Sequence, residues 1–190
     1  MPTSSPRHQN KRKHRAARTR KLRKELAKQM ETDTDLSHRT AIHRKTASAP
    51  TRWLWERGHL RPDQHTLDYG CGRGADTAWL EDRGVAVQGF DPHYAPDPIA
   101  LIGKYARIVC NYVLNVVGPD ARLPVLQAVQ DALESDGVAY VTVRSDVEAS
   151  SHGVTTGRGT VQYDVRLDLP IVHKGSGFRT YELTKLSVLN

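Results

Sequence analysis

The sequence predicts an α/β fold built on a doubly wound, mostly parallel sheet with a C-terminal antiparallel hairpin. Three observations predict it. Short apolar runs of strand length alternate with helical segments over residues 66–143. A glycine-rich turn joins the first of these runs to a helix. After residue 146 the pattern changes to polar and apolar alternation interrupted by glycine and proline, which is typical of hairpins.

The first half of the domain is expected to contain a helix that begins near Ser48, a strand over 66–69, a helix over 76–83 and a strand over 85–90. Ser48 is a favourable N-cap, and a proline two residues later suits the first helical turn. Gly58 and Gly84 are expected to end the two helices, because glycine readily adopts the left-handed conformation that follows a helix. Three prolines occur between residues 92 and 104, so no regular strand is expected there.

The second half is expected to contain a strand over 107–113, a helix over 120–133 and a strand over 138–143. The first of these strands is almost wholly apolar before it runs into a loop, which is typical of a buried parallel strand. Pro124 is expected to interrupt the helix early, because proline has no N–H for the helical ladder, and Gly137 is expected to end it. The hairpin is expected to pair residues 161–167 with residues 178–189.

The most informative segment is Leu67-Asp68-Tyr69-Gly70-Cys71-Gly72-Arg73-Gly74, where the first strand turns into a helix. Its glycines allow the backbone to turn sharply and to lie against a ligand. Asp91 follows the next strand, where a carboxylate can accept hydrogen bonds from ribose hydroxyls. Strand, glycine turn, helix, strand and acid, in this order, are typical of a Rossmann-like nucleotide-binding unit.

Asp68 narrows the choice of nucleotide. A dinucleotide places its pyrophosphate on the helix N-terminus, and an acid just before the first glycine would repel it. The same acid suits a ligand with an ammonium group and no phosphate, such as S-adenosylmethionine (SAM). The segment resembles motif I of the class I SAM-dependent methyltransferases. The expected cofactor-binding residues are Asp68, Gly70, Gly72, Gly74, Asp91, Pro92 and Asn111.

Groups that act on an acceptor are expected at the carboxyl ends of the strands. The candidate catalytic residues are Asn111, Tyr112 and His93, which would align the acceptor and take up a proton. Core packing of Tyr112 and lining of an adenine pocket by His93 remain alternatives. Candidate acceptor-binding residues are Arg44, Asn115 and Arg158, with a loop cap as the alternative for Asn115 and a solvated loop for Arg158. The nine histidines show no ligand spacing, so no metal site is predicted.

A narrower resemblance covers roughly residues 38–162. Motif I, Phe90-Asp91-Pro92 and Asn111-Tyr112-Val113-Leu114-Asn115 occur here in the order found in methyltransferases associated with bacterial DNA phosphorothioation systems. This resemblance implies that His38, Arg39 and Arg44 line the entrance for cofactor or acceptor. The chain departs from it in its shorter C-terminal part and its basic N-terminal arm. The association is genomic and does not establish DNA as the substrate.

The N-terminal segment carries the positive charge of the chain. Residues 1–24 contain ten Lys or Arg and no acid, whereas the whole chain has a net charge of +7, which leaves the remainder near −3. We expect residues 1–37 to form a basic, disordered arm and linker, and residues 38–190 to form the methyltransferase domain. Such an arm suits nucleic acid, with solubilisation or partner docking as the alternative. The cations expected at this contact are Lys11, Arg12, Lys13, Arg15, Arg18 and Arg20.

These observations predict a SAM-dependent methyltransferase that acts on nucleic acid or on a nucleic-acid-associated acceptor. A small-molecule or protein methyltransferase and a catalytically idle SAM-binding accessory protein remain alternatives. No Asp-Pro-Pro-Tyr motif is present, which argues against ordinary methylation of an adenine or cytosine amino group. No apolar run has the length of a membrane span, and two cysteines without a disulfide framework predict a cytoplasmic location. The pattern specifies no oligomeric state.

Overall fold

The computed structural model describes Lys21 and residues 36–148, 150 and 152–189. Its helices are η1 (Leu36–Thr40, a 3₁₀ helix), α2 (Ala49–Glu56), α3 (Ala75–Glu81) and α4 (Pro119–Ala132). The main sheet contains β1 (Thr66–Tyr69), β2 (Val87–Phe90), β3 (Tyr105–Asn111), β4 (Leu133–Arg144), β7 (Ile171–Lys174) and β8 (Phe178–Thr184). A separate pair consists of β5 (Val154–Thr155) and β6 (Val161–Gln162).

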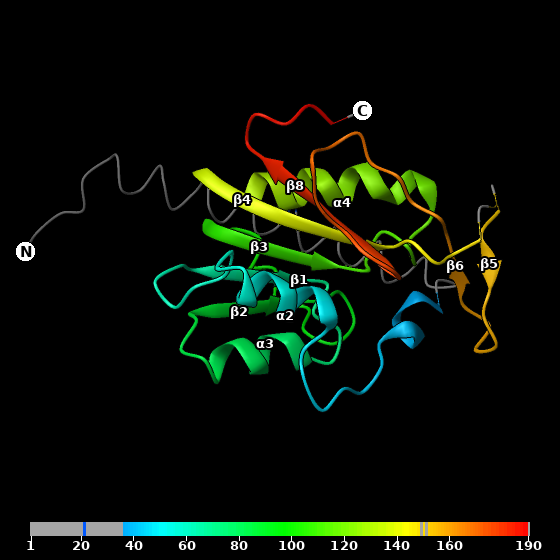
Figure 1. The fold of residues 1–190 in the computed structure, drawn as a ribbon, viewed down its shortest axis with the longest axis horizontal. Helices are drawn as coiled ribbons and strands as arrows, with labels where there is room; N and C mark the ends of the chain where they lie inside the picture. The colour runs from blue at the N-terminus through cyan, green and yellow to red at the C-terminus, as the bar shows by residue number, and fades with distance from the viewer. Residues whose placement is uncertain (1–20, 22–35, 149, 151, 190) are drawn as a thin grey trace, which may run out of the picture.

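The six strands of the main sheet lie in the order β2-β1-β3-β4-β8-β7. Strands β1 to β4 pair in parallel, and β8 pairs antiparallel with β4 on one side and with β7 on the other. Helix α4 lies on one side of the sheet and helices α2 and α3 on the other (Figure 1). The Rossmann-like α/β fold with an antiparallel C-terminal hairpin is therefore confirmed.

Strand β3 is buried on both faces, as its apolar sequence predicts. Ile108 and Val109 are both fully buried, yet they belong to different apolar clusters because successive side chains of a strand point to opposite faces. Ile108 packs in the cluster that includes Leu126 and Val129 of α4. Val109 packs in the cluster that includes Leu54 of α2 and Leu80 of α3. This burial fixes the end of β3 beside the end of β1, where the site lies.

The predicted elements up to residue 104 are confirmed with small shifts of their ends. Strand β1 has the expected bounds, and Ser48 caps α2 by accepting a hydrogen bond from the backbone N–H of Thr51. Gly58 and Gly84 have φ values of 74° and 79°, the conformation that ends a helix. Residues 92–104 contain no strand, only an isolated bridge between Asp91 and Ala95.

The expectation for Pro124 is wrong, because this residue lies within α4. The helix begins at Pro119, which occupies its first turn as proline often does. Pro124 removes one backbone hydrogen bond, the one to the carbonyl of Asp120, close to the N-terminus of a fourteen-residue helix. The helix tolerates this single loss because its later turns bury Val125, Leu126 and Val129 against the sheet.

The expectation that Gly137 ends the helix is also wrong. The helix ends at Ala132, and Leu133 already has an extended backbone and begins β4. Gly137 instead lies where the register between β3 and β4 shifts. A Cβ at Gly137 would lie 2.7 Å from the carbonyl oxygen of Tyr105, so the close approach of the two strands requires glycine.

The predicted pairing within the hairpin is wrong as well. Residues 161–162 form β6 and pair with β5, whereas β8 inserts between β4 and β7. Tyr181 and Leu183 of β8 are buried in the cluster on the α4 face. Pairing β8 with β4 therefore buries apolar side chains that a hairpin with residues 161–167 would leave outside the main sheet.

Two further predictions concern membrane-spanning helices and the N-terminal arm. Among the described helices, none combines the length and apolar character needed to cross a lipid bilayer. The arm cations at positions 11–20 lie outside the described residues.

Candidate functional site

A cleft of about 450 Å³ opens at the carboxyl ends of β1, β2 and β3. Strand β1 lies between β2 and β3, so the chain order reverses at this point, which is where ligands bind in open α/β sheets. The cleft is lined by the turn after β1, by residues 91–93 and by residues 111–113. Residues from 37–44, here called the N-terminal strap, also line it. Its volume suits a small organic ligand.

The glycine turn packs closely against neighbouring side chains at two of its three glycines. Gly70, Gly72 and Gly74 all have positive φ, at 76°, 54° and 76°. A Cβ at Gly70 would lie 2.2 Å from Cγ2 of Val113, and one at Gly72 would lie 3.2 Å from Cβ of Ala41. A Cβ at Gly74 would meet nothing within 4 Å. Gly70 thus excludes a side chain by conformation and by space, whereas a side chain at Gly72 or Gly74 is disfavoured mainly by conformation.

Asp68 lies buried in the wall of the cleft. The hydroxyl of Thr77 donates a hydrogen bond of 2.8 Å to its carboxylate. Burial, followed by the charge of Asp76, raises the pKa of Asp68 to about 8. A cationic group beside Asp68 would stabilise the ionised carboxylate, so this position favours an ammonium-bearing ligand.

Asp91 lies directly after β2 and lines the cleft. Its Oδ1 accepts hydrogen bonds of 2.9 Å from the backbone N–H groups of His93 and Tyr94. Its Oδ2 accepts one of 3.1 Å from the N–H of Gly72 in the glycine turn. Because a carboxylate offers about four lone-pair positions, Oδ2 retains one acceptor position for a ribose hydroxyl.

Asn111 belongs to a network that the sequence analysis did not predict. The carboxylate of Asp76 accepts hydrogen bonds of 2.6 Å from the N–H and the hydroxyl of Ser48 and from the hydroxyl of Thr51. Asn111 Nδ2 donates to the same carboxylate at 3.1 Å and to Thr51 at 2.9 Å. Because a carboxylate only accepts, the Asn111 amide must turn its NH₂ group inward.

This orientation leaves Oδ1 of Asn111 buried and without a hydrogen-bond partner among the described residues. Buried polar atoms are nearly always paired, so this acceptor can take one more hydrogen bond, from a ligand group or from water. Asn111 is therefore suited to meet an ammonium of the cofactor or an N–H of the acceptor. Sequence analysis had named Asn111 for both roles.

Tyr112 follows Asn111 and has a positive φ of 64°. Among the described residues, no other non-glycine residue has a positive φ. Backbone strain of this kind is concentrated at functional sites. The guanidinium carbon of Arg44 lies 5.9 Å from the centre of the Tyr112 ring. Burial, the largest effect, raises the pKa of the Tyr112 hydroxyl. The phenol is therefore a hydrogen-bond donor at neutral pH and is unsuited to act as a base.

His93 lies at the mouth of the cleft and is exposed. Its ring stacks on that of His38, with centroids 4.2 Å apart, and meets Tyr94 edge-on. The Tyr94 hydroxyl donates to the carbonyl of His38 at 3.1 Å, and Arg73 donates to the carbonyl of Ala41 at 3.3 Å. These contacts hold the strap across the cleft. Sequence analysis identified His38 but missed Tyr94, Arg73 and Ala41.

The structure does not place Asn115 in the cleft, so the predicted acceptor contact is wrong. The residue is fully buried, and both ends of its amide are paired. Nδ2 donates to the carbonyl of Tyr163 and Oδ1 accepts from the backbone N–H of Arg144, each at 2.8 Å. Asn115 caps the loop after β3, which is the alternative that the sequence left open. Arg158 lies exposed at the turn between β5 and β6, outside the lining of the cleft.

The sequence as a whole matches a known family. A family model described as a methyltransferase domain matches residues 12–168, which is most of the chain. The chain belongs to this methyltransferase family. No functionally curated protein matches the methyltransferase in sequence.

The chain also shows a limited likeness to several solved structures. Burkholderia thailandensis 1,6-didemethyltoxoflavin-N1-methyltransferase, crystallised with S-adenosylhomocysteine (SAH), is 17% identical, with 96% of this chain and 91% of that chain covered and a TM-score of 0.48. TehB from Haemophilus influenzae is 12% identical over 73% of this chain and 62% of that one, with a TM-score of 0.47. A SAM-dependent methyltransferase from Archaeoglobus fulgidus is 13% identical, with a TM-score of 0.43. The chain covers 54% of that archaeal protein, and 53% of this chain is matched.

The methyltransferase uses SAM as its methyl donor, since the family and the composition of the cleft agree. When bound, SAM supplies a methyl group on a positively charged sulfur. The residues that would hold it fit its chemistry: a glycine turn in which Gly70 leaves no room for a Cβ, the orphan Oδ1 of Asn111, the buried carboxyl of Asp68 and the carboxylate of Asp91. The individual roles of these residues stay predictions.

Proposed function

We propose that this SAM-dependent methyltransferase modifies nucleic acid or an acceptor bound to nucleic acid. The observation that carries the proposal is the set of ten Lys or Arg within the first 24 residues. That density of positive charge favours a polyanion, because each neutralised phosphate releases counterions. The arm continues in sequence into the strap that lines the cleft, so an acceptor held by the arm would be tethered at the cleft mouth.

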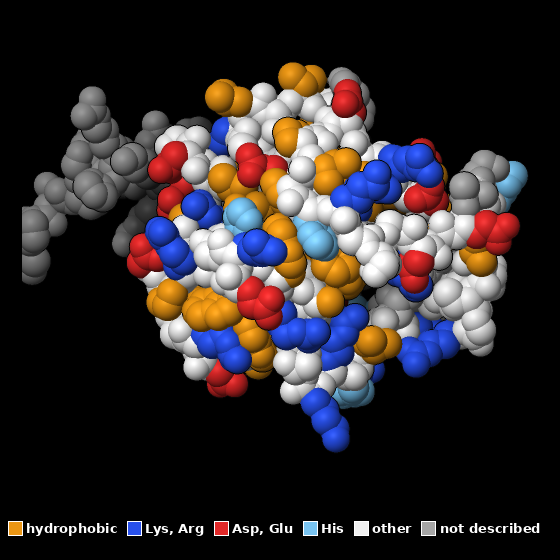
Figure 2. Space-filling model, in the orientation of Figure 1, with side chains coloured by type: hydrophobic (Ala, Val, Ile, Leu, Met, Phe, Trp, Pro, Cys, Tyr) orange, Lys and Arg blue, Asp and Glu red, His pale blue; other side chains and the backbone are white. Residues whose placement is uncertain are grey.

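The distribution of charge in the folded part supports separate places for acceptor binding and for methyl transfer. Basic and acidic side chains are interspersed on the face in Figure 2. Exposed cations nevertheless continue into the strap at Arg39 and Arg44 and just beyond it at Lys45. We infer that the arm supplies most of the affinity for the acceptor and that the cleft supplies the chemistry.

The side chains at the end of β3 would align the acceptor. Asn111 Oδ1 accepts a hydrogen bond and the Tyr112 phenol donates one, so the pair can orient a group that has both a donor and an acceptor. Methyl transfer from a sulfonium depends mainly on such alignment and on exclusion of water. The strap, fixed to Tyr94 and Arg73, would exclude water from above the cleft. His93 at the mouth remains the candidate for proton removal.

The proposal also covers the type of nucleic acid and the cellular location. The resemblance to methyltransferases of DNA phosphorothioation systems favours DNA over RNA. Cys71 and Cys110 are both free thiols, in keeping with a cytoplasmic location.

Transfer of label from methyl-labelled SAM tests the proposal. The full chain is incubated with duplex DNA, RNA, a protein fraction or a metabolite extract, each alone, and Asp91→Ala serves as the inactive control. We expect label in nucleic acid with the native protein only. Label confined to the metabolite or protein fraction would support the alternative acceptors. SAH binding without transfer to any fraction would indicate an idle SAM-binding accessory protein.

A further inference from the structure

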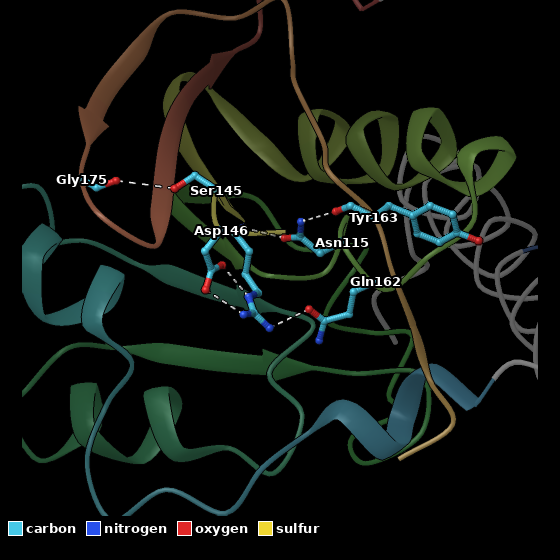
Figure 3. A network of polar contacts seen from close by, with 7 residues as sticks. Asn115, Ser145, Asp146, Gln162, Tyr163 and Gly175 are labelled. Atoms are coloured by element: carbon cyan, nitrogen blue, oxygen red, sulfur yellow. Dashed lines mark hydrogen bonds and ion pairs between the residues drawn. The ribbon is translucent and has the colours of Figure 1, made fainter. Parts of the chain in front are cut away.

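Arg144, at the end of β4, is oriented by hydrogen bonds to its neighbours. Its Nε and Nη2 donate to the two carboxylate oxygens of Asp146 at 2.9 and 2.8 Å. Its Nη1 donates to Oε1 of Gln162 at 2.7 Å. Asp146 and Gln162 come from different segments and converge on the same guanidinium (Figure 3). A planar guanidinium fixed on two sides is preoriented for an oxyanion.

The backbone brings the end of β4 next to Tyr112. The N–H of Tyr112 donates to the carbonyl of Thr142 at 2.8 Å, two residues before Arg144. Although burial raises the pKa of the Tyr112 hydroxyl most, the charges of Arg44 and Arg144 lower it. Two cations from distant parts of the chain therefore act on one phenol at the edge of the cleft.

The guanidinium of Arg144 has capacity for another partner. Three of its five N–H groups are used, which leaves one on Nη1 and one on Nη2. Its side chain is 40% exposed and that of Asp146 is 50% exposed. An ion pair so open to water is weak, so Asp146 orients Arg144 without cancelling its attraction for a second anion.

We propose that Tyr112, Arg44 and Arg144 form an acceptor subsite for a single nucleotide unit, with its base against the Tyr112 ring and its phosphate on the two arginines. The subsite rests on the proposed function: Tyr112 and Arg44 line the cleft, and Arg144, which lies outside that lining, would extend it. An aromatic ring flanked by cations matches a planar base that carries a phosphate. Neither Arg144 nor Asp146 was singled out by the sequence.

The subsite also gives Asn115 a function. Its amide holds the backbone N–H of Arg144 on one side and the carbonyl of Tyr163, next to Gln162, on the other. Figure 3 shows Asn115 between these two segments. Asn115 and Asp146 are thus positioning residues for Arg144 and make no contact of their own with the acceptor.

Calorimetric titration of the SAH-loaded full chain tests the subsite. The probes are the four common 2′-deoxyribonucleoside 5′-monophosphates, their nucleosides and inorganic phosphate. At least one monophosphate should bind about tenfold or more tightly than its nucleoside, as expected for hydrogen bonds to a charged group. Arg144→Gln should bring this ratio close to one while SAH affinity stays unchanged. Asp146→Asn should lower the ratio in part, and Arg144→Lys should restore only part of it.

The matched control is Arg61→Gln. Arg61 forms the same two-pronged contact with an aspartate two residues later, but it lies before the start of β1, whereas the cleft lies at the carboxyl end of that strand. This variant should keep the native ratio. Equal binding of nucleotide and nucleoside, no binding of any monophosphate, or an unchanged ratio in Arg144→Gln would overturn the subsite. Nucleic-acid methylation that persists with a ratio of one would refute the subsite and leave the proposed function standing. A preserved ratio without nucleic-acid methylation would support the subsite and refute the proposed function.

Discussion

At the scale of single residues, Asp68 is a carboxylic acid buried where its ionisation is unfavourable. Burial and the nearby Asp76 raise its pKa to about 8, so the free protein holds a proton there at neutral pH. An ammonium group bound beside it would lower that pKa. Binding would therefore release the proton.

We predict that the affinity for SAH rises with pH between about 6 and 8 and levels off above 8. The sign follows because the complex binds fewer protons than the free protein over that range. Calorimetry in two buffers with different ionisation heats measures the released proton. Asp68→Asn should bind more weakly and without proton release. Proton uptake, or no exchange, by the native protein would argue against an ammonium at Asp68.

The glycine turn allows a paired test of steric exclusion. Gly70→Ala combines a positive φ with a contact of 2.2 Å to Val113, whereas Gly74→Ala has the same φ and open space. We expect Gly74→Ala to lower the free energy of unfolding by about 1 kcal/mol, from backbone strain alone. Gly70→Ala should cost about 2–4 kcal/mol and weaken SAH binding. Urea unfolding measures both variants, and equal losses would contradict the close packing.

Sequence reasoning placed residues correctly near the cleft where the local course of the chain decides their position. Asp68, the glycines and Asp91 can be recognised because the turn and the strand ends fix their positions along the chain. The sequence did not reveal the contacts of Arg144 and Tyr94, because their hydrogen-bond partners lie 18 and 56 positions away in the chain. Asn115 was misassigned because an amide at a strand end can face either a ligand or the backbone.

At the scale of elements, one carboxylate joins α2, α3 and β3. Asp76 lies in the first turn of α3, accepts hydrogen bonds from Ser48 and Thr51 at the start of α2, and holds Asn111 at the end of β3. The network fixes the three elements around the cleft. It also keeps Oδ1 of Asn111 available to a ligand.

Asp76→Asn should lower the free energy of unfolding by about 2–3 kcal/mol, because its NH₂ group would face donors in a buried network. Urea unfolding followed by circular dichroism measures the change. The control is Asp63→Asn at an exposed ion pair, for which we expect at most about 0.5 kcal/mol. Similar values for the two variants would show that the network contributes little.

Element positions were predictable where periodicity and turn residues agreed, as for β1 and the absence of a strand in 92–104. They were not predictable where long-range pairing decided the outcome. Gly137 was assigned to a helix end, although it is required by the approach of Tyr105 from β3. The partner of β8 depended on apolar burial beside β4, which neither segment reveals alone.

At the scale of the whole molecule, positive charge and chemistry occupy different parts of the chain. The arm carries ten cations in 24 residues, and the rest is near −3. We therefore expect replacement of the six predicted cations at 11–20 by Gln, in the full chain, to leave SAH affinity unchanged. Affinity for a duplex of about 20 base pairs should fall, and its dependence on salt should weaken. Filter binding across a salt series measures both. An unchanged salt dependence would argue against the arm as the nucleic-acid contact.

The central claim is that the cleft at the ends of β1, β2 and β3 binds the SAM family of nucleosides. Calorimetric titration of SAH into the native protein and Asp91→Ala tests it most directly. The native protein should bind one SAH per chain, and Asp91→Ala, folded by circular dichroism, should bind about tenfold to a hundredfold more weakly. A native protein that does not bind SAH, or a variant that binds it equally well, would contradict the account.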